Sequence, residues 1–563
     1  MKRSIPRIVC VALILLMGGE KLFATDVGGI ICTNTTWNLA GSPYIVTGSS
    51  GIVIGCNATL TIETGVVVKF NPTLAIVVGS NAFGNGCLVA RGTTESPIIF
   101  TSIKDPCNIL DPARPGDWSR IHFTDYAVDA VFDAGNYVSG CILEHVIVEY
   151  AGYGNYGAVF AEKSSPFLNY CEVRHNLYYG IQVDGTNAPF IKITNCEVWD
   201  HSQCGITISG GSDHKLLNNN IHDNRGGGIS FNSSGNTLIG NTISDNTGGD
   251  GGGIYFHCWS GGNTLTGNTI SGNTSGRGGG IFFWNSGSDT LTENTISGNT
   301  ASGDGGGICF WGPGSNTLTG NTISGNTSGG SGGGICFYAS GSMTLTGNTI
   351  TGNTAGGSGG GLYFGGSGGS TLTRNAVQTN TSKNGLGAVH LSGSGDTVFS
   401  QNVITNNYIV TGTTGGIYIT NSERVSLAGD PDTGAYNIIC GNDGYQVYNN
   451  NPFNADGRND VNAVYVRWGT CDIQQTMAGI FDYFDDATRA FVIFYPFVCV
   501  IPGDFDFDQD VDLLDLETFV ENWLRQDCAI PDWCEGTDLD LSTNVDFVDF
   551  AYFAENWLFG VGP

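Results

Sequence analysis

A 27-residue repeat in the middle of the chain constrains its fold more than any other feature. Between about Arg225 and Asn407, a glycine run ends in an apolar residue at Ile254 and again 27 residues later at Ile281. The same step continues through Ile308, Ile335, Leu362 and Val389. A fixed period of this length without a helical pattern is typical of solenoid proteins.

Each repeat predicts short strands rather than helices. Ile281 and Phe283 alternate with Phe282 and Trp284, and two more short apolar pieces follow before Asn299. Gly, Ser and Asn separate these pieces, and Gly and β-branched residues disfavour a helix. We therefore expect an all-β fold, a parallel β-helix with three strands per turn and ~4.8 Å between coils.

Stacked coils place identical side chains in columns. One predicted column is an inward ladder of Phe231, Phe256, Phe283, Phe310, Phe337 and Phe364. Two asparagine ladders are predicted, the first at Asn241, Asn268, Asn294, Asn321, Asn348, Asn375 and Asn402, the second at Asn246, Asn273, Asn299, Asn326, Asn353, Asn380 and Asn407. The alternating Arg225, Asp250, Arg277 and Asp304 predict a ladder of ion pairs, each contributing only ~0.2–1 kcal/mol.

Composition restricts the partners. The net charge is −29 and only 22 residues are Lys or Arg, which argues against nucleic acid and anionic membranes. Residues 1–24 have the charged start, apolar core and cleavage site of a secretory signal, and the core is too short to span a membrane. We expect a protein that is secreted, extracellular or at the cell surface, without a transmembrane segment after signal removal.

Seventeen cysteines are compatible with an exported chain. Cys171 and Cys196, like Cys309 and Cys336, lie one turn apart, so each pair is predicted to be either a disulfide or two buried thiols. Cys528 and Cys534 predict a bridge across a short loop.

The predicted domain order follows the changes in pattern. Residues 25–117 form an N-terminal cap and first turns, 118–407 the β-helix with its regular repeats at 225–407, 408–500 a C-terminal cap, and 501–563 a small separate module. Over residues 25–500 the glycine-run repeats, the segment from Leu60 to Phe70, Gly116-Asp-Trp118 and Trp468-Gly-Thr resemble secreted bacterial right-handed parallel β-helix proteins. That resemblance and the general chirality of parallel crossovers imply a right-handed coil.

The C-terminal module carries two acidic loops. Acidic oxygens follow one another from Asp504 to Asp515 at loop positions 1, 3, 5, 9 and 12, and a similar pattern returns 34 residues later from Asp538 to Asp549. An apolar helical pattern follows each loop. Between Asp504 and Glu555 there are 16 acidic residues and one basic residue, Arg525. Hard cations prefer oxygen ligands at this spacing, so the module predicts Ca²⁺ binding.

Residues 503–558 resemble a type I dockerin. The resemblance implies first-site ligands at Asp504, Asp506, Asp508, Asp512 and Asp515 with the carbonyl of Asp510, and second-site ligands at Asp538, Asp540, Ser542, Asp546 and Asp549 with the carbonyl of Asn544. Gln509 and Thr543 stand where the family has a loop glycine. Leu513-Leu514 and Phe547-Val548 replace the small hydroxyl residues that meet a cohesin. A cohesin-like partner, surface anchoring and self-docking all remain open.

The early turns hold the densest group of ionisable residues. Aligned on Val173 and Val198, the coils stack Glu172 on Glu197, and neighbouring rows collect the candidate catalytic residues Glu172, Arg174, Glu197, Asp200, His201, His222 and Asp223. Carboxylates on adjacent coils suit acid–base catalysis or a cation, whereas the alternative is a polar solenoid face without chemistry.

An aromatic strip offers a second kind of site. The outward positions of the regular repeats include the candidate glycan-binding residues Tyr255, Trp284, Trp311 and Tyr338. Exposed aromatic patches favour sugar binding, whereas burial under a loop would be purely structural. We favour a polysaccharide- or cell-surface-glycan-binding β-helix with a Ca²⁺-dependent attachment module. The alternatives are a polysaccharide lyase or glycoside hydrolase acting from the Glu172–Asp223 face, and a structural surface adhesin.

Overall fold

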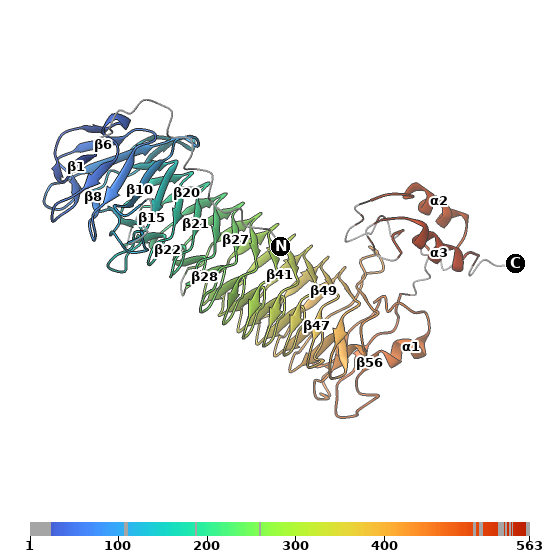
Figure 1. Cartoon of the computed structure of the whole chain (residues 1–563). Helices are drawn as coiled ribbons and strands as arrows, with labels where there is room; N and C mark the ends of the chain where they lie inside the picture. Colours follow the sequence, from blue (N-terminus) through green and yellow to red (C-terminus); the bar gives the residue numbers. More distant parts are fainter. Residues whose placement is uncertain are drawn as a thin grey trace.

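The computed structural model describes residues 24–105, 111–185, 189–257 and 260–498, and in the C-terminal module residues 503–505, 511–526, 528, 534, 537–539, 542 and 544–558. The predicted signal at 1–24 therefore lies almost wholly outside the described residues. The chain winds into one elongated parallel solenoid (Figure 1). Its all-β, parallel architecture is the predicted one.

Three long parallel sheets run along the solenoid. Sheet A has 16 strands, from β1 (Thr25–Val27) to β53 (Ile438–Cys440). Sheet B pairs 17 strands, from β2 (Gly29–Ile31) to β56 (Ile480–Phe481). Sheet C has 14 strands, from β3 (Thr35–Trp37) to β49 (Val398–Ser400). Each strand pairs with the equivalent strand one turn away, so every column of side chains follows the solenoid axis.

A regular turn contains one strand more than predicted. One such turn runs through β32 (Ile281–Trp284) in sheet B, β33 (Thr290–Thr292) in sheet C, β34 (Thr295–Ser297) in sheet A and β35 (Thr300–Ala301). The last of these belongs to a six-stranded sheet from β31 (Thr274–Ser275) to β51 (Tyr408–Ile409). Asn299, of the second asparagine ladder, directly precedes β35 and bonds to Asn326 on the next coil. The two residues that follow it, Thr300 and Ala301, therefore also lie in register with that coil.

The predicted phenylalanine column is confirmed. The rings of Phe283 and Phe310 have centroids 4.6 Å apart and planes 5° from parallel, and similar stacking runs from Phe231 to Phe364. These side chains are buried inside the coil. Because each ring covers the next, the column forms a continuous apolar core.

Both asparagine ladders are confirmed. The Asn294 side-chain amide donates to Asn321 Oδ1 and to the Leu265 carbonyl, both at 2.9 Å, and its own Oδ1 accepts from the Asn268 backbone N–H at 2.9 Å. Each side chain thus satisfies two buried backbone groups of the preceding coil and bonds to the asparagine side chain of the next coil. The ladders continue beyond the regular repeats, to Asn219 and Asn224 at one end and to Asn437 and Asn442 at the other.

The predicted ion-pair ladder is wrong except for one rung. Arg277 pairs with Asp250 at 2.6 Å, whereas Asp304 accepts a hydrogen bond from the Ser331 backbone N–H. The Arg277 guanidinium instead lies over two rings of sheet B, 4.7 Å from the Phe282 centroid and 5.0 Å from that of Trp311. The aromatic rings therefore compete with Asp304 for this cation.

Both cysteine pairs predicted on adjacent coils take the thiol alternative. Cys171, Cys196, Cys309 and Cys336 are buried free thiols. The Cys528–Cys534 disulfide is present as predicted, and a further disulfide joins Cys32 to Cys56 on adjacent coils.

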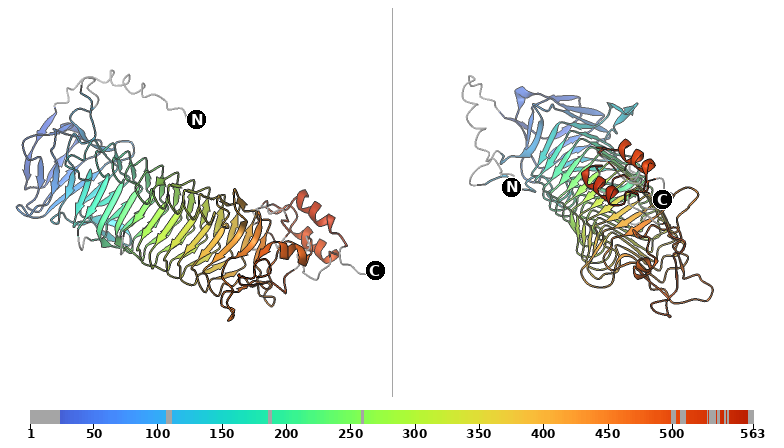
Figure 2. Two further views of the ribbon diagram at one scale, coloured as in Figure 1. Left: turned by 90° about the horizontal axis from the view of Figure 1, so that it is seen from below. Right: turned by 90° about the vertical axis from the view of Figure 1, so that its right-hand side faces the viewer.

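The coil continues into the segment predicted as a C-terminal cap. There, β52 (Thr414–Thr420), β54 (Tyr445–Asn449) and β56 extend sheet B, beside helix α1 (Ile473–Ala478). Helices α2 (Leu513–Glu521) and α3 (Phe547–Glu555) lie at the C-terminal end of the solenoid (Figures 1 and 2). Within the described residues, no helix has the length and apolar character needed to cross a membrane.

Candidate functional site

The predicted ionisable face lies on the outside of sheet A. Strands β18 (Glu172–Arg174), β21 (Glu197–Trp199) and β24 (Asn220–His222) pair in the predicted register, so Glu172 stacks on Glu197 and Arg174 on Trp199. The structure brings these predicted candidates together as neighbours on successive coils.

Most carboxylates on this face have a cationic or imidazole partner. Arg174 pairs with Glu149 at 2.9 Å and also bonds to Glu172. His222 lies between Glu197 at 3.1 Å and Asp223 at 2.7 Å. His175 lies 2.7 Å from Asp200. The face is therefore a continuous network of paired groups, in which a catalytic carboxylate would first have to exchange its partner for a substrate.

His201 does not lie on this face. It is buried, and its Nε2 lies 3.1 Å from the Val173 carbonyl while its backbone N–H donates to Asn224 Oδ1. Asn224 makes the equivalent contact to Val198 one coil further on. His201 thus replaces an asparagine in the ladder, and burial lowers its pKa to about 4, so the ring stays neutral. This position removes it from any substrate on the outer surface.

The aromatic strip on sheet B is partly exposed and partly buried. Trp284 and Trp311 are register partners on neighbouring coils, 40% and 36% exposed, and the Trp311 ring lies 4.9 Å from that of Tyr338. The next outward column is covered, since Phe282, Cys309 and Cys336 are buried and Tyr255 packs beside them. Of the four predicted glycan-binding residues, Trp284, Trp311 and Tyr338 form one column and Tyr255 lies in the covered one.

A second cluster on sheet B was not predicted. His122 on β11 (Ile121–Phe123) lies 3.0 Å from Glu162 on β16 (Val159–Glu162), and its ring stacks on Phe160 at 4.7 Å. The Arg120 guanidinium lies 3.8 Å from the centroid of the Tyr156 ring. Burial and then Arg120 lower the pKa of His122 to about 4, so its imidazole is neutral. These coils lack the regular repeat, so no sequence period could predict that the five side chains lie together.

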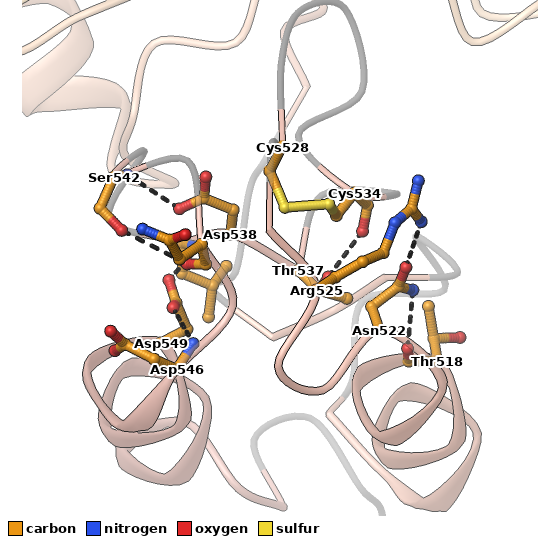
Figure 3. The surroundings of a disulfide bond; sticks show 12 residues. Thr518, Asn522, Arg525, Cys528, Cys534, Thr537, Asp538, Ser542, Asp546 and Asp549 are labelled. Carbon is orange, nitrogen blue, oxygen red and sulfur yellow. Dashed lines mark hydrogen bonds between the residues drawn. A yellow bond between two sulfur atoms is a disulfide. The ribbon is translucent and has the colours of Figure 1, made fainter.

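The C-terminal module repeats one local structure. Asp515 accepts from the backbone N–H groups of Phe505 and Asp512, and Asp549 accepts in the same way from Leu539 and Asp546. Figure 3 shows Asp538, Ser542, Asp546 and Asp549 gathered at the start of α3. Of the other predicted ligands, Asp506, Asp508, Asp510 and Asp540 lie outside the described residues.

The described part of the module holds buried carboxylates but no group of three or more His, Cys, Asp or Glu side chains placed to bind a metal ion. The side chains of Asp504, Asp515, Asp538 and Asp549 are all buried, in a segment whose one basic residue is Arg525. Buried carboxylates in such an acidic segment are unfavourable unless a cation neutralises them, and Ca²⁺ prefers oxygen donors.

The family model described as "Right handed beta helix region" matches residues 126–300 and 277–452, which together span more than half of the chain. The chain belongs to this right-handed β-helix family. The match supports the predicted hand of the coil and covers the Trp284–Trp311–Tyr338 column, whereas Arg120 and His122 precede the matched residues. No curated protein matches the chain.

Several solved structures are distantly similar to this β-helix. The periplasmic alginate epimerase AlgG is 13% identical, with 70% of this chain and 84% of that chain covered and a TM-score of 0.32. The Azotobacter vinelandii mannuronan C-5 epimerase AlgE6 A-module is 12% identical, with 67% and 91% covered and a TM-score of 0.33. Bacteriophage CBA120 tailspike protein 3 is 11% identical, with 71% and 56% covered and a TM-score of 0.38. No residue role is carried over at these values.

The two clusters of this β-helix share one face. Register partners on the outer side of sheet B run from Glu162 to Asp184 and then Ser209 in the early coils. Trp284, Trp311 and Tyr338 follow on the outer side of the same sheet further along the axis. A ligand lying along sheet B would therefore meet an ionisable region and an aromatic region in turn.

Proposed function

We propose that this β-helix binds a polysaccharide or cell-surface glycan along the outer face of sheet B. The observation that carries the proposal is the pair of exposed tryptophans, Trp284 and Trp311, which are register partners on neighbouring coils. Large exposed apolar side chains are unfavourable in water unless a ligand covers them, and sugar rings stack on aromatic faces. Consecutive sugar rings along the axis would meet consecutive aromatic rings.

The surroundings of the tryptophans suit a preformed platform. Tyr338 extends the column by one coil, and the Arg277 guanidinium packs beside Trp311. Their backbones belong to a continuous parallel sheet, so little ordering is needed when a ligand binds.

A second candidate function is catalysis on the same polysaccharide. The neutral His122 ring on sheet B lies close to the guanidinium of Arg120 and the phenol of Tyr156, which come from the segments before β11 and β16. A neutral imidazole can accept a proton, a guanidinium can pair with a sugar carboxylate, and a phenol can donate a proton, which is the group set for lyase or epimerase chemistry. The paired carboxylates of the Glu172–Asp223 face favour this role less, because each already has a partner.

The C-terminal module is proposed to attach the β-helix to another protein in a Ca²⁺-dependent manner. Bound Ca²⁺ would neutralise the carboxylates of the two loops. The helices expose two matching apolar pairs, Leu513-Leu514 and Phe547-Val548, which a cohesin-like or surface-anchoring partner would cover. Such attachment fits a secreted or cell-surface protein.

A glycan array followed by affinity measurement tests the main proposal. The wild-type protein is expected to bind at least one class of polysaccharide on the array. The double variant Trp284→Ala/Trp311→Ala is expected not to bind that polysaccharide. Tyr408→Ala, which removes another exposed ring from the short fourth sheet, should bind normally. Turnover of a bound uronate polymer that disappears in His122→Gln would establish the second candidate, and neither binding nor turnover would leave a structural adhesin.

A further inference from the structure

We propose that a cleft on the outer face of sheet C is a separate binding site for a sugar unit carrying an acidic group. The cleft has a volume of about 460 Å³ and lies where the hairpin of β12 (Val131–Asp133) and β13 (Asn136–Ser139) meets β14 (Ile142–Glu144), β17 (Phe167–Asn169) and β20 (Lys192–Thr194). This volume falls within the ~300–1,000 Å³ of typical small-molecule sites.

The hairpin wall is held in place by aromatic and polar contacts. Phe132 packs edge-on against Phe167 with ring centroids 5.1 Å apart. Lys192 Nζ donates to the carbonyl of Gly135 at 2.9 Å, and the Tyr137 hydroxyl donates to the Gly140 carbonyl at 2.6 Å. The cleft is therefore formed before any ligand arrives, which lowers the ordering cost of binding.

The floor is a row of polar side chains on successive coils. Arg91 Nε pairs with Glu144 at 2.7 Å, and Asn169 donates to the other oxygen of Glu144 at 2.8 Å. Thr194 in turn donates to Asn169 Oδ1 at 2.7 Å. This chain of bonds fixes each group, and the Arg91 side chain, 54% exposed, uses only Nε in it. Its terminal nitrogens can meet a carboxylate or sulfate in a forked geometry.

The cleft is positively charged, whereas the protein as a whole is strongly negative. Arg91 and Lys192 line it with one acid, Glu144, in a chain of net charge −29. Lys215 is the register partner of Lys192 on the next coil, and like charges on adjacent strands are unfavourable. Burial and then Lys215 lower the pKa of Lys192 below its usual value. An anion bound beside Lys192 would oppose both effects.

The walls supply aromatic faces for a sugar ring. Tyr137 lines the cleft from the hairpin, and Tyr170 lines it from the end of β17, where it is about half exposed and stacks on His145 at 4.7 Å. An aromatic wall combined with amide, hydroxyl and cationic groups matches a ring whose hydroxyls and acidic substituent both need partners. The cleft lies on sheet C and the aromatic column on sheet B, so the two binding surfaces are separate.

Titration of the full-length protein with short oligosaccharides tests this site. We expect uronate or sulfated oligomers to bind at least tenfold more tightly than neutral oligomers of equal length, with affinity falling as salt rises. Whichever acid group binds more tightly identifies the source of the anion. Lys192→Met and Arg91→Gln should each weaken binding about tenfold, whereas Lys383→Met, a charge loss on an exposed loop, should not.

A blocking variant separates ligand binding from hairpin stability. Asn136→Trp fills the cleft from an exposed hairpin position and keeps both bases, so it should abolish binding without lowering the melting temperature. Trp284→Ala should leave short anionic sugars bound, which distinguishes this site from sheet B. Equal affinity for neutral and acidic oligomers, or acidic binding unchanged in Asn136→Trp, would overturn the proposal.

Discussion

The buried carboxylate of Asp289 accepts two hydrogen bonds from Asn263, one from its backbone N–H at 2.9 Å and one from its side-chain amide at 2.8 Å. In the same way, Asn263 Oδ1 accepts a hydrogen bond from the Asn236 backbone N–H, and Asn316 Oδ1 accepts one from the Asp289 backbone N–H. These residues form a third, shorter ladder before sheet C. A single aspartate thus occupies a position that asparagine fills on the coils to either side.

This aspartate should make stability depend on pH. Burial raises the pKa of Asp289 to about 6, although its hydrogen bonds with Ser286 and Asn263 oppose the rise. The folded protein therefore holds this proton more tightly than the unfolded chain does, so stability falls as pH rises from about 4 to about 6. Asp289→Asn should stabilise the protein at pH 7 by on the order of 3 kcal/mol. Denaturation of wild type and Asp289→Asn at pH 4 and pH 7 measures the difference in their free energies of unfolding. A difference that is equal at the two pH values would contradict the prediction.

The central ladders should be costly to interrupt. Asn294→Ala removes the acceptor of the Asn268 backbone N–H and a donor to the Leu265 carbonyl, and both groups are buried. We expect a loss of roughly 2–4 kcal/mol, because unsatisfied buried polar groups cost about 1–3 kcal/mol each. Hydrogen exchange should show faster exchange on the two adjoining coils. Thr295→Ala, at the neighbouring exposed position, serves as control, and equal effects would refute a special role for the ladder.

Ca²⁺ should stabilise the C-terminal module alone. Chelation is expected to unfold α2 and α3 while sheets A, B and C keep their circular dichroism, because the buried aspartates would then repel one another. Asp549→Asn should weaken Ca²⁺ binding about tenfold or more, whereas Glu517→Gln, at an exposed position of α2, should not. Protease resistance of the module that is identical with and without chelator would exclude a calcium requirement.

The ionisable face of sheet A should not be needed for glycan binding. Asp200→Asn and Asp223→Asn each remove one charge from a histidine pair on sheet A, whereas Trp284 lies on sheet B. We expect polysaccharide affinity within twofold of wild type for both variants. A tenfold loss in either one would transfer the binding site from sheet B to sheet A.

The regular coils could be predicted from the sequence because one period fixes all their columns. Phe283 stacks on Phe310, and Asn294 on Asn321, since equal spacing leaves a single register. The early coils differ in length, so His201 could not be recognised as a ladder residue from its neighbours. The sheet C cleft also could not be predicted from the sequence, because it depends on a hairpin whose Phe132 packs against Phe167.

The most direct test of a glycan-binding face on sheet B uses the double variant Trp284→Ala/Trp311→Ala. Its affinity is measured for the glycan that the wild-type protein binds. Binding along sheet B predicts at least a tenfold weaker affinity with only a small change in melting temperature, because neither side chain belongs to a buried core cluster. Tyr408→Ala should match wild type. A double variant that binds the glycan as tightly as wild type would contradict a binding face on sheet B.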